Sequence, residues 1–153
     1  GHRRRATIYM DRPGKKAIVV AQHYNGANGV LVEGDSPIVL DNPQEGDHLA
    51  EALRAALAAS EVRPLTGLGS RTSDDWRAFQ VSGVRSVGAF EEAFIPIMVS
   101  GANEANIIYE LEGFPEPDAD LRVSSSISAA SRELGERCLS VWRACRDRAP
   151  RLS

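Results

Sequence analysis

Carboxylates are densest between residues 110 and 118, where the sequence runs ELEGFPEPD. Such a cluster has the chemistry to bind a metal ion or to supply the paired acid and base of a glycosidase. The run lacks the Asp/Asn–Gly spacing of a calcium loop, and its two prolines favour an exposed, extended loop. We interpret it as an acidic contact loop. A small enzyme or ligand-binding domain that uses the carboxylates of residues 110–118 is the alternative.

Other residue types that perform catalysis lack a partner at a recognisable spacing. His23 and His48 have the chemistry of a general base, but neither has a neighbouring nucleophile in a recognisable catalytic motif. The serines at 124–126 lack the Gly-x-Ser-x-Gly elbow, and no Walker or Gly-x-Gly-x-x-Gly motif is present. No Cys-x-x-Cys pair is present either. The sequence therefore predicts a protein that is not an enzyme, with no catalytic residue, no metal site and no cofactor.

Acidic residues also form two blocks that contain no Lys or Arg. The first block spans residues 17–53 and holds six carboxylates, and the second spans residues 86–121 and holds eight. If the fold brings these blocks together, they form one acidic face that attracts a basic partner and repels nucleic acid. Solvated strand ends and loops are the alternative explanation.

The second block carries two aromatic residues, Tyr109 and Phe114, inside its carboxylate-rich part. We predict that they are apolar anchors of a protein interface, because such anchors sit within a polar rim. The candidate partner-binding residues are therefore Tyr109, Glu110, Glu112, Phe114, Glu116, Asp118, Asp120, Glu33 and Asp35.

Hydrophobic patterning predicts the elements that must position these side chains. Strands are expected at 17–21, 29–33, 36–40, 94–99, 106–111 and 121–124, and helices at 47–59 and 128–146. Short helices are expected at 74–80 and 86–92, and a surface loop at 63–73. This order predicts an α+β fold with a mostly antiparallel twisted sheet packed against helices. It also suggests two β-β-β-α units, at 6–62 and 74–149, by duplication or by convergence.

Composition fits one globular domain over residues 3–149. Of the 153 residues, 42% are hydrophobic and 25% are charged. No apolar run approaches the roughly 20 residues of a membrane span, and no secretory signal follows the N-terminal arginines. Cys138 and Cys145 lie in one predicted helix. They are about 10 Å apart along its axis, which is too far for a disulfide. We therefore expect a cytoplasmic protein with no membrane contact.

Four short segments of the second half carry a family resemblance. They are Trp76-x-x-Phe79, residues 86–91 (SVGAFE), the predicted strand at 95–99, and residues 131–136 (SRELGE) in the last predicted helix. Together they resemble the CdiI-type immunity proteins of bacterial contact-dependent growth inhibition systems. The resemblance covers about residues 75–145, and the first half has no match.

This resemblance implies a cytoplasmic immunity protein that binds and blocks the C-terminal toxin domain of a CdiA effector. Such toxins are commonly nucleases that act on tRNA, and a nuclease active site is basic because it binds phosphates. A carboxylate-rich face suits that site. The family has no catalytic motif, so the resemblance implies no catalytic residue in this chain. Direct nucleic-acid binding is not expected. An oligomeric structural subunit is a third, weaker reading.

Overall fold

The computed structural model describes residues 2–26, 29–45, 47–63 and 73–147. Residues 64–72 of the predicted loop and residues 148–149 of the predicted domain lie outside this description. The described elements, in chain order, are β1 (Arg5–Asp11), β2 (Lys16–Asn25), β3 (Leu31–Glu33), β4 (Ile38–Asp41), α1 (His48–Ala59), β5 (Val62–Arg63), α2 (Arg77–Ser82), α3 (Val87–Ala93), β6 (Phe94–Gly101), β7 (Ile108–Glu116), β8 (Ala119–Ser126) and α4 (Ser131–Arg146).

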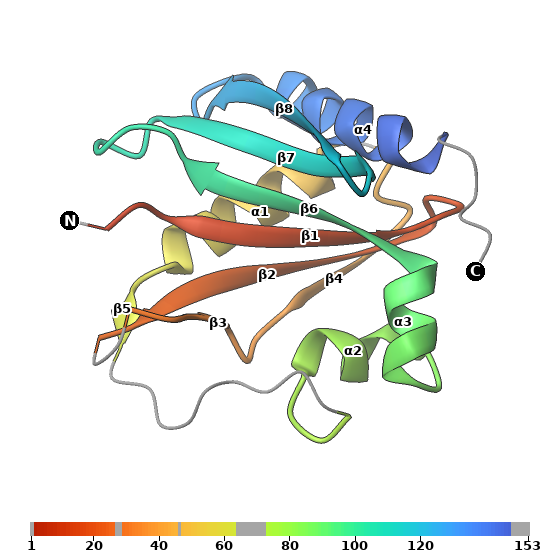
Figure 1. The fold of residues 1–153 in the computed structure, drawn as a ribbon. Helices are drawn as coiled ribbons and strands as arrows, with labels where there is room; N and C mark the ends of the chain where they lie inside the picture. Colours follow the sequence, from red (N-terminus) through yellow and green to blue (C-terminus); the bar gives the residue numbers. More distant parts are fainter. Residues whose placement is uncertain (1, 27–28, 46, 64–72, 148–153) are drawn as a thin grey trace.

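The strands form one twisted sheet in the order β3-β2-β1-β6-β7-β8 (Figure 1). Strands β4 and β5 also pair with β2, and the β2–β5 pair is the parallel one among antiparallel neighbours. The predicted class, an α+β fold with a mostly antiparallel sheet packed against helices, is confirmed. None of the helices described here is long and apolar enough to cross a membrane.

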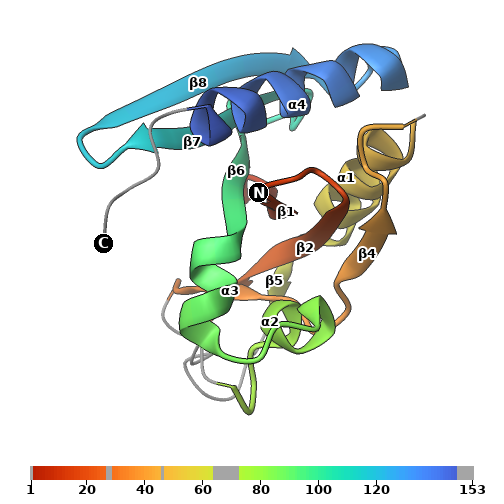
Figure 2. The ribbon, with the colours of Figure 1, turned by 90° about the vertical axis from the view of Figure 1, so that its right-hand side faces the viewer.

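The helices cover the two faces of the sheet unequally. Helices α1 and α4 lie behind the sheet in the view of Figure 1, whereas α2 and α3 lie in front of one end of it (Figures 1 and 2). Side chains alternate between faces along a strand, so each central strand contributes to two cores. On β1, for example, Ile8 and Met10 belong to the rear core, and Tyr9 belongs to the front core.

The rear core is the larger one, and Trp142 of α4 is fully buried in it. The indole Nε1–H donates to the carbonyl of Asp11 at 3.2 Å, and the Arg146 guanidinium lies 4.5 Å from the ring centroid. Leu134, Cys138 and Val141 of the same helix are also buried. These side chains form an apolar stripe along α4 that belongs to the core.

The front core is an aromatic cluster that fixes α2 and α3 to the sheet. The Trp76 and Phe90 ring centroids lie 4.9 Å apart at an interplanar angle of 83°, and Phe94 stacks on Phe90 at 4.9 Å. The Glu33 carboxylate accepts hydrogen bonds from Trp76 Nε1, at 3.0 Å, and from the Tyr9 hydroxyl. Glu33 thus joins edge strand β3 to the start of α2.

Several element boundaries differ from the sequence prediction. Strand β1 was not predicted, and it lies at the centre of the sheet between β2 and β6. The final helix begins at Ser131 instead of residue 128. Asp47, the first residue of the helix predicted at 47–59, is the N-cap of α1, and its side chain forms no capping hydrogen bond. Ser86 does cap α3, accepting from the Ala89 amide at 3.1 Å.

The two proposed β-β-β-α units pair their strands differently. Strands β6, β7 and β8 form a meander in which each strand pairs with the preceding one. In the first half, β3 and β4 both pair with β2. The described strand pairing therefore does not repeat between the halves.

Gly113 of β7 lies against α4 and leaves no room for a side chain. A Cβ there would lie 2.6 Å from Val141 Cγ1 and 2.8 Å from Cys145 Sγ. We expect Gly113→Ala to lower the free energy of unfolding by about 1–3 kcal/mol, as overpacked cores do. Gly135→Ala is the control: nothing lies within 4 Å of that Cβ, and alanine favours a helix interior by roughly 0.5–1 kcal/mol. Urea unfolding of both variants measures this, and equal effects would contradict the packing argument.

No disulfide joins Cys138 to Cys145, as the spacing predicts. Burial raises the pKa of the Cys138 thiol to about 12. Because the thiolate is the reactive form, Cys138 should resist iodoacetamide at pH 8 in the folded protein and react after unfolding in urea. Mass spectrometry of the alkylated tryptic peptides measures this. Alkylation of folded Cys138 as fast as of the unfolded protein would contradict the buried placement.

Candidate partner-binding surface

Helix α3 covers only the start of β6, and none of the described helices lies over the front of β7, β8 and the rest of β6 (Figure 1). This uncovered part of the sheet is the candidate surface. We call it the open face, and it carries Met98, Ile108, Glu110, Glu112, Phe114, Asp120 and Arg122. Their shared orientation follows from the register, in which Met98 pairs with Glu112 and Glu112 pairs with Arg122. Burial alternates strictly along β7, with Tyr109, Leu111 and Gly113 inward and the even-numbered residues outward.

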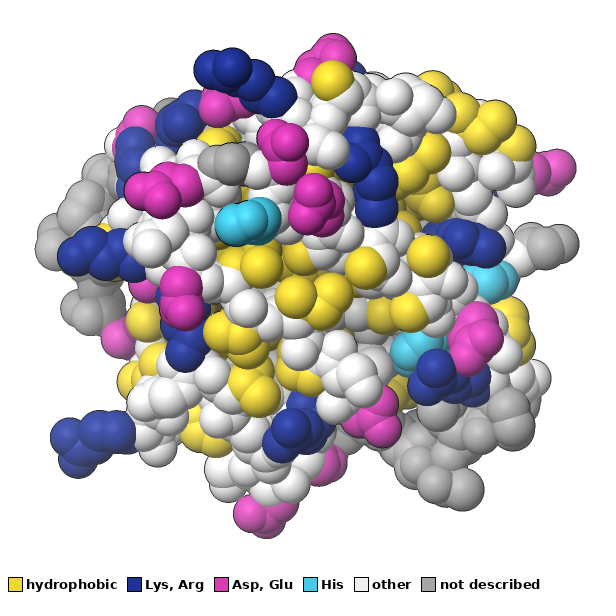
Figure 3. Space-filling model, turned by 180° about the vertical axis from the view of Figure 1, so that it is seen from behind, with side chains coloured by type: hydrophobic (Ala, Val, Ile, Leu, Met, Phe, Trp, Pro, Cys, Tyr) yellow, Lys and Arg dark blue, Asp and Glu magenta, His cyan; other side chains and the backbone are white. Residues whose placement is uncertain are grey.

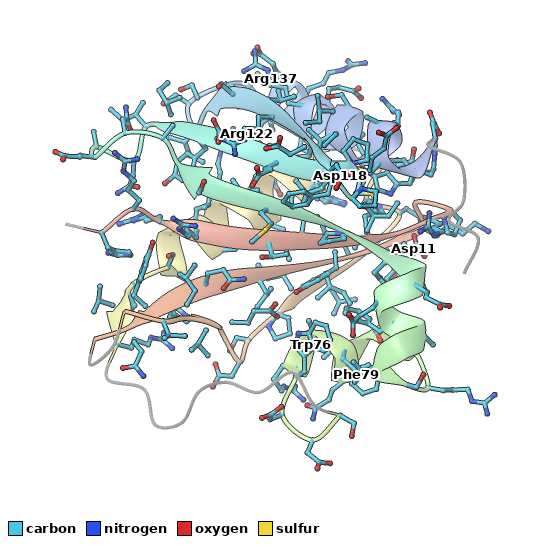
Figure 4. The ribbon with its side chains drawn as sticks, in the orientation of Figure 1. Asp11, Trp76, Phe79, Asp118, Arg122 and Arg137 are labelled. Atoms are coloured by element: carbon cyan, nitrogen blue, oxygen red, sulfur yellow. The ribbon has the colours of Figure 1, made fainter. Side chains whose placement is uncertain are left out.

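Arg122 lies among three carboxylates on the open face. Its guanidinium is 2.6 Å from Asp120, 3.0 Å from Glu112 and 3.3 Å from Glu110, and Figure 4 shows where the side chain lies on the sheet. One cation among three carboxylates leaves an excess of negative charge when all are ionised. These carboxylates raise the pKa of Arg122, so it stays charged.

Glu112 and Asp120 share one hydrogen bond across the strand pair, and their pKa values move apart. That hydrogen bond raises the pKa of Glu112 and lowers the pKa of Asp120, which Arg122 lowers further. A carboxyl with a raised pKa beside an ionised one is a pattern that general acid catalysis uses. Here Arg122 pairs with both groups, and no group of three or more His, Cys, Asp or Glu among the described residues is arranged to hold a metal.

Apolar side chains lie beside these charges. Met98, Ile108 and Phe114 are 39%, 37% and 44% exposed, which is high for large hydrophobic residues in strands. Large apolar side chains and aromatics are enriched in the centres of protein interfaces, whereas alanine is depleted there. The open face therefore combines apolar anchors with a charged surround.

The opposite surface has a different composition. Figure 3 shows hydrophobic side chains across the middle of the rear, with charged side chains mostly around them. On α1 the exposed apolar residues are Ala55, Ala58 and Ala59. Since alanine offers little contact area, this surface lacks large anchors on α1.

The prediction of an extended loop at 110–118 is wrong: residues 110–116 belong to strand β7, and residues 117–118 form the turn of a β-hairpin. Strand β7 continues to Glu116, β8 begins at Ala119, and the pair turns at Pro117 and Asp118. Pro115 lies inside β7, where the register shifts between Gly113 and Glu116, and an irregularity of this kind accommodates proline in a strand. The hairpin tip with Asp118 projects toward the open face, on the same side of β6 as α3 (Figures 2 and 4).

Tyr109 is not an exposed anchor. It is 3% exposed and belongs to the rear core, because odd-numbered residues of β7 face α4. Burial raises the pKa of its hydroxyl. Phe114, one of the even-numbered residues, is the aromatic residue of this stretch that remains exposed.

The structure also separates Glu33 and Asp35 of the first acidic block from the β7 carboxylates of the second. Glu33 lies on β3, four strands from Glu110 on β7, which corresponds to roughly 19 Å at the usual strand spacing. Its carboxylate is bound to Trp76 and Tyr9. Asp35 follows β3 at the same distant edge. The candidate residues brought together are Glu110, Glu112, Phe114 and Asp120, with Glu116 and Asp118 at the hairpin tip.

Three residues of the open face were missed by sequence reasoning. Arg122 was not expected to pair with carboxylates on two strands, because cross-strand register is not visible in a sequence. Met98 and Ile108 lie in the predicted strands at 94–99 and 106–111, but neither residue is assigned to a face of the sheet from the sequence. Strict alternation along 108–114 was the available signal, since it places Ile108 and Phe114 on one face and Tyr109 on the other.

His23 does not form a polar cleft. It is 4% exposed, and its Nδ1 accepts from the Glu61 amide at 3.3 Å. Desolvation lowers the pKa of His23, and the nearby Arg63 lowers it further. A buried histidine with a lowered pKa stays neutral at physiological pH, which fits a structural role.

Comparison with known proteins gives the fold alone. No family model matches the chain, and no curated protein matches it significantly. Among solved structures, the fold is similar to that of NMB0488 from Neisseria meningitidis, a protein of unknown function. The TM-score is 0.66 at 13% sequence identity, and the match covers 94% of this chain and 96% of that chain. The two proteins share an architecture over nearly their whole lengths.

Proposed function

We propose that this protein is a CdiI-type immunity protein that binds the C-terminal toxin domain of a CdiA effector in the cytoplasm and neutralises it. The toxin is a nuclease, and the open face covers its basic active site or substrate surface. The observation that carries the proposal is the open face itself, where Met98, Ile108 and Phe114 lie beside three carboxylates and one arginine.

A surface of this kind suits binding to a basic protein. A specific interface buries on the order of 800 Å² per partner and needs a few desolvated anchors within a polar surround. The excess negative charge speeds encounter with a basic surface and selects against acidic partners. The four segments that resemble CdiI-type proteins point to the same class. Two of these segments also supply the front core, through Trp76, Phe79 and Phe90.

Growth protection tests this function. We predict that a toxin domain is encoded directly upstream of this gene. That domain is expressed from an inducible promoter, with or without this protein. We expect this protein to restore growth and the tRNA pool to the level seen with a catalytically inactive toxin. An unrelated immunity protein is the control. Unchanged toxicity in the presence of folded, abundant protein would reject the proposal.

Charge reversal on the hairpin should slow association with the toxin. Replacing Glu112, Glu116 and Asp118 together by lysine should lower the association rate on the order of tenfold at low salt. The effect should shrink at high salt, because the Debye length falls to about 3 Å at 1 M. The same change at Glu45, Glu51 and Glu136, which lie on or near the rear helices, is the matched control. Surface plasmon resonance at several salt concentrations measures this, and equal rates for both triple variants would contradict the charge argument.

A further inference from the structure

A groove of about 190 Å³ lies at the border between the open face and the helices that cover the rest of the front. Its walls come from β1, α3, β6 and the N-cap residue of α2, and they include the rings of Tyr9, Trp76, Phe90 and Phe94. Pro96, Met98, Thr7 and Glu91 complete the lining. In Figure 4, Trp76 lies at this helix-covered end of the sheet, and the open strands with Arg122 lie beyond it.

The size of the groove limits what it can hold. Pockets for drug-sized ligands and cofactors are usually about 300–1,000 Å³. A cavity of roughly 150 Å³ holds a benzene ring. The groove therefore has room for one large side chain, and not for a cofactor.

The walls and the rim indicate which side chain fits. Aromatic and methionine walls favour an apolar or delocalised group, and the carboxylate at the mouth favours a cation. Glu91 is exposed on α3, and its carboxylate has no hydrogen bond or ion pair with the described residues. The excess carboxylates around Arg122 lie on the adjoining open face. Arginine combines these properties, because its planar guanidinium packs on rings and also pairs with carboxylates.

We propose that this groove binds an arginine side chain from a basic segment of the protein partner. The stem of the arginine lies along Met98 and Pro96, and the guanidinium reaches the aromatic wall and Glu91. This inference rests on the proposed function, because it names the residue type of the toxin that the front of the sheet receives.

The chain provides its own internal controls for a test by NMR. It has two tryptophans and two methionines. Trp76 and Met98 line the groove, whereas Trp142 and Met10 are fully buried in the rear core. The protein is labelled with ¹⁵N on the indoles and ¹³C on the methionine methyls. It is titrated separately with N-acetyl-arginine amide, with its neutral analogue N-acetyl-citrulline amide and with N-acetyl-phenylalanine amide.

We expect the arginine probe to shift the Trp76 indole and Met98 methyl signals saturably, with Trp142 and Met10 unchanged. The citrulline probe should bind more weakly. Glu91→Gln should weaken arginine binding roughly two- to fivefold, the usual value of one exposed ion pair. Glu92→Gln is the matched control, because Glu92 is the adjacent carboxylate on α3 and does not line the groove.

Three results would overturn the inference. They are equal shifts at the rear-core probes, binding of citrulline or phenylalanine as tight as that of arginine, and equal effects of the two glutamate variants. The outcome is separable from that of the proposed function. If the protein protects against the toxin but the arginine probe does not shift the Trp76 and Met98 signals, the groove assignment is wrong and the proposed function stands. If arginine marks the groove but no toxin is neutralised, the proposed function is wrong.

Discussion

Replacing Trp142 by alanine should lower the free energy of unfolding by about 3–5 kcal/mol, the largest stability effect that we expect from a single substitution here. The ring is fully buried between α4 and the sheet, so its loss leaves a cavity. The Asp11 carbonyl also loses the 3.2 Å hydrogen bond from Nε1. For a chain of this size, the melting temperature should fall by roughly 6–20 °C.

Trp142→Phe is the matched variant, because it keeps most of the ring volume and removes only the indole N–H. We expect it to lose a smaller part of the stability, about 1–2 kcal/mol. Differential scanning calorimetry of the two variants separates packing from hydrogen bonding. An unchanged melting temperature for Trp142→Ala would show that α4 is not the core element described here.

Replacing both Phe114 and Met98 by alanine should weaken toxin binding by about 30-fold or more. The lower bound corresponds to one desolvated hot spot, which contributes at least about 2 kcal/mol, because about 1.4 kcal/mol corresponds to a factor of ten in affinity. Both side chains are substantially exposed in the free protein, so folding depends little on them. Isothermal titration calorimetry with the toxin domain measures the affinity, and thermal unfolding checks that stability is preserved.

Val62→Ala is the control for this pair. Val62 is 52% exposed, and it lies on β5 at the far edge of the sheet from β7 and β8. Val62→Ala should leave the affinity for the toxin domain unchanged. If the double variant binds as tightly as the wild type, the anchors lie elsewhere and the open face is not the interface.

The sequence predicts most elements of this fold because the strand and helix periods are clear. Strand β1 was missed although its pattern is informative. Residues 6–10 (ATIYM) are all buried, as expected for a central strand covered on both faces. Three arginines directly before this run, at 3–5, make the segment look like a polar terminus. Whether this segment becomes a central strand depends on its burial in the tertiary structure, which the sequence does not display.

The candidate surface was predictable only in part. The carboxylates and Phe114 were found from composition, but their arrangement depends on strand register. Tyr109 and Phe114 are similar in type, and the alternation along β7 sends one inward and the other outward. Two prolines suggested a loop at 110–118, whereas the register shift near Pro115 lets the hairpin continue. The separation of Glu33 from Glu110 follows from a strand order that local patterns do not encode.

Hydrogen–deuterium exchange of this protein, alone and with the proposed cognate toxin domain in excess, tests the central proposal most directly. If the toxin binds the open face, amide exchange should slow in peptides from the β7–β8 hairpin and from α3, while peptides from α1 remain unchanged. The rear helix α1 serves as the internal reference because it lies on the opposite side of the sheet (Figure 2). No slowing anywhere in the chain, or slowing confined to α1, would contradict the proposal.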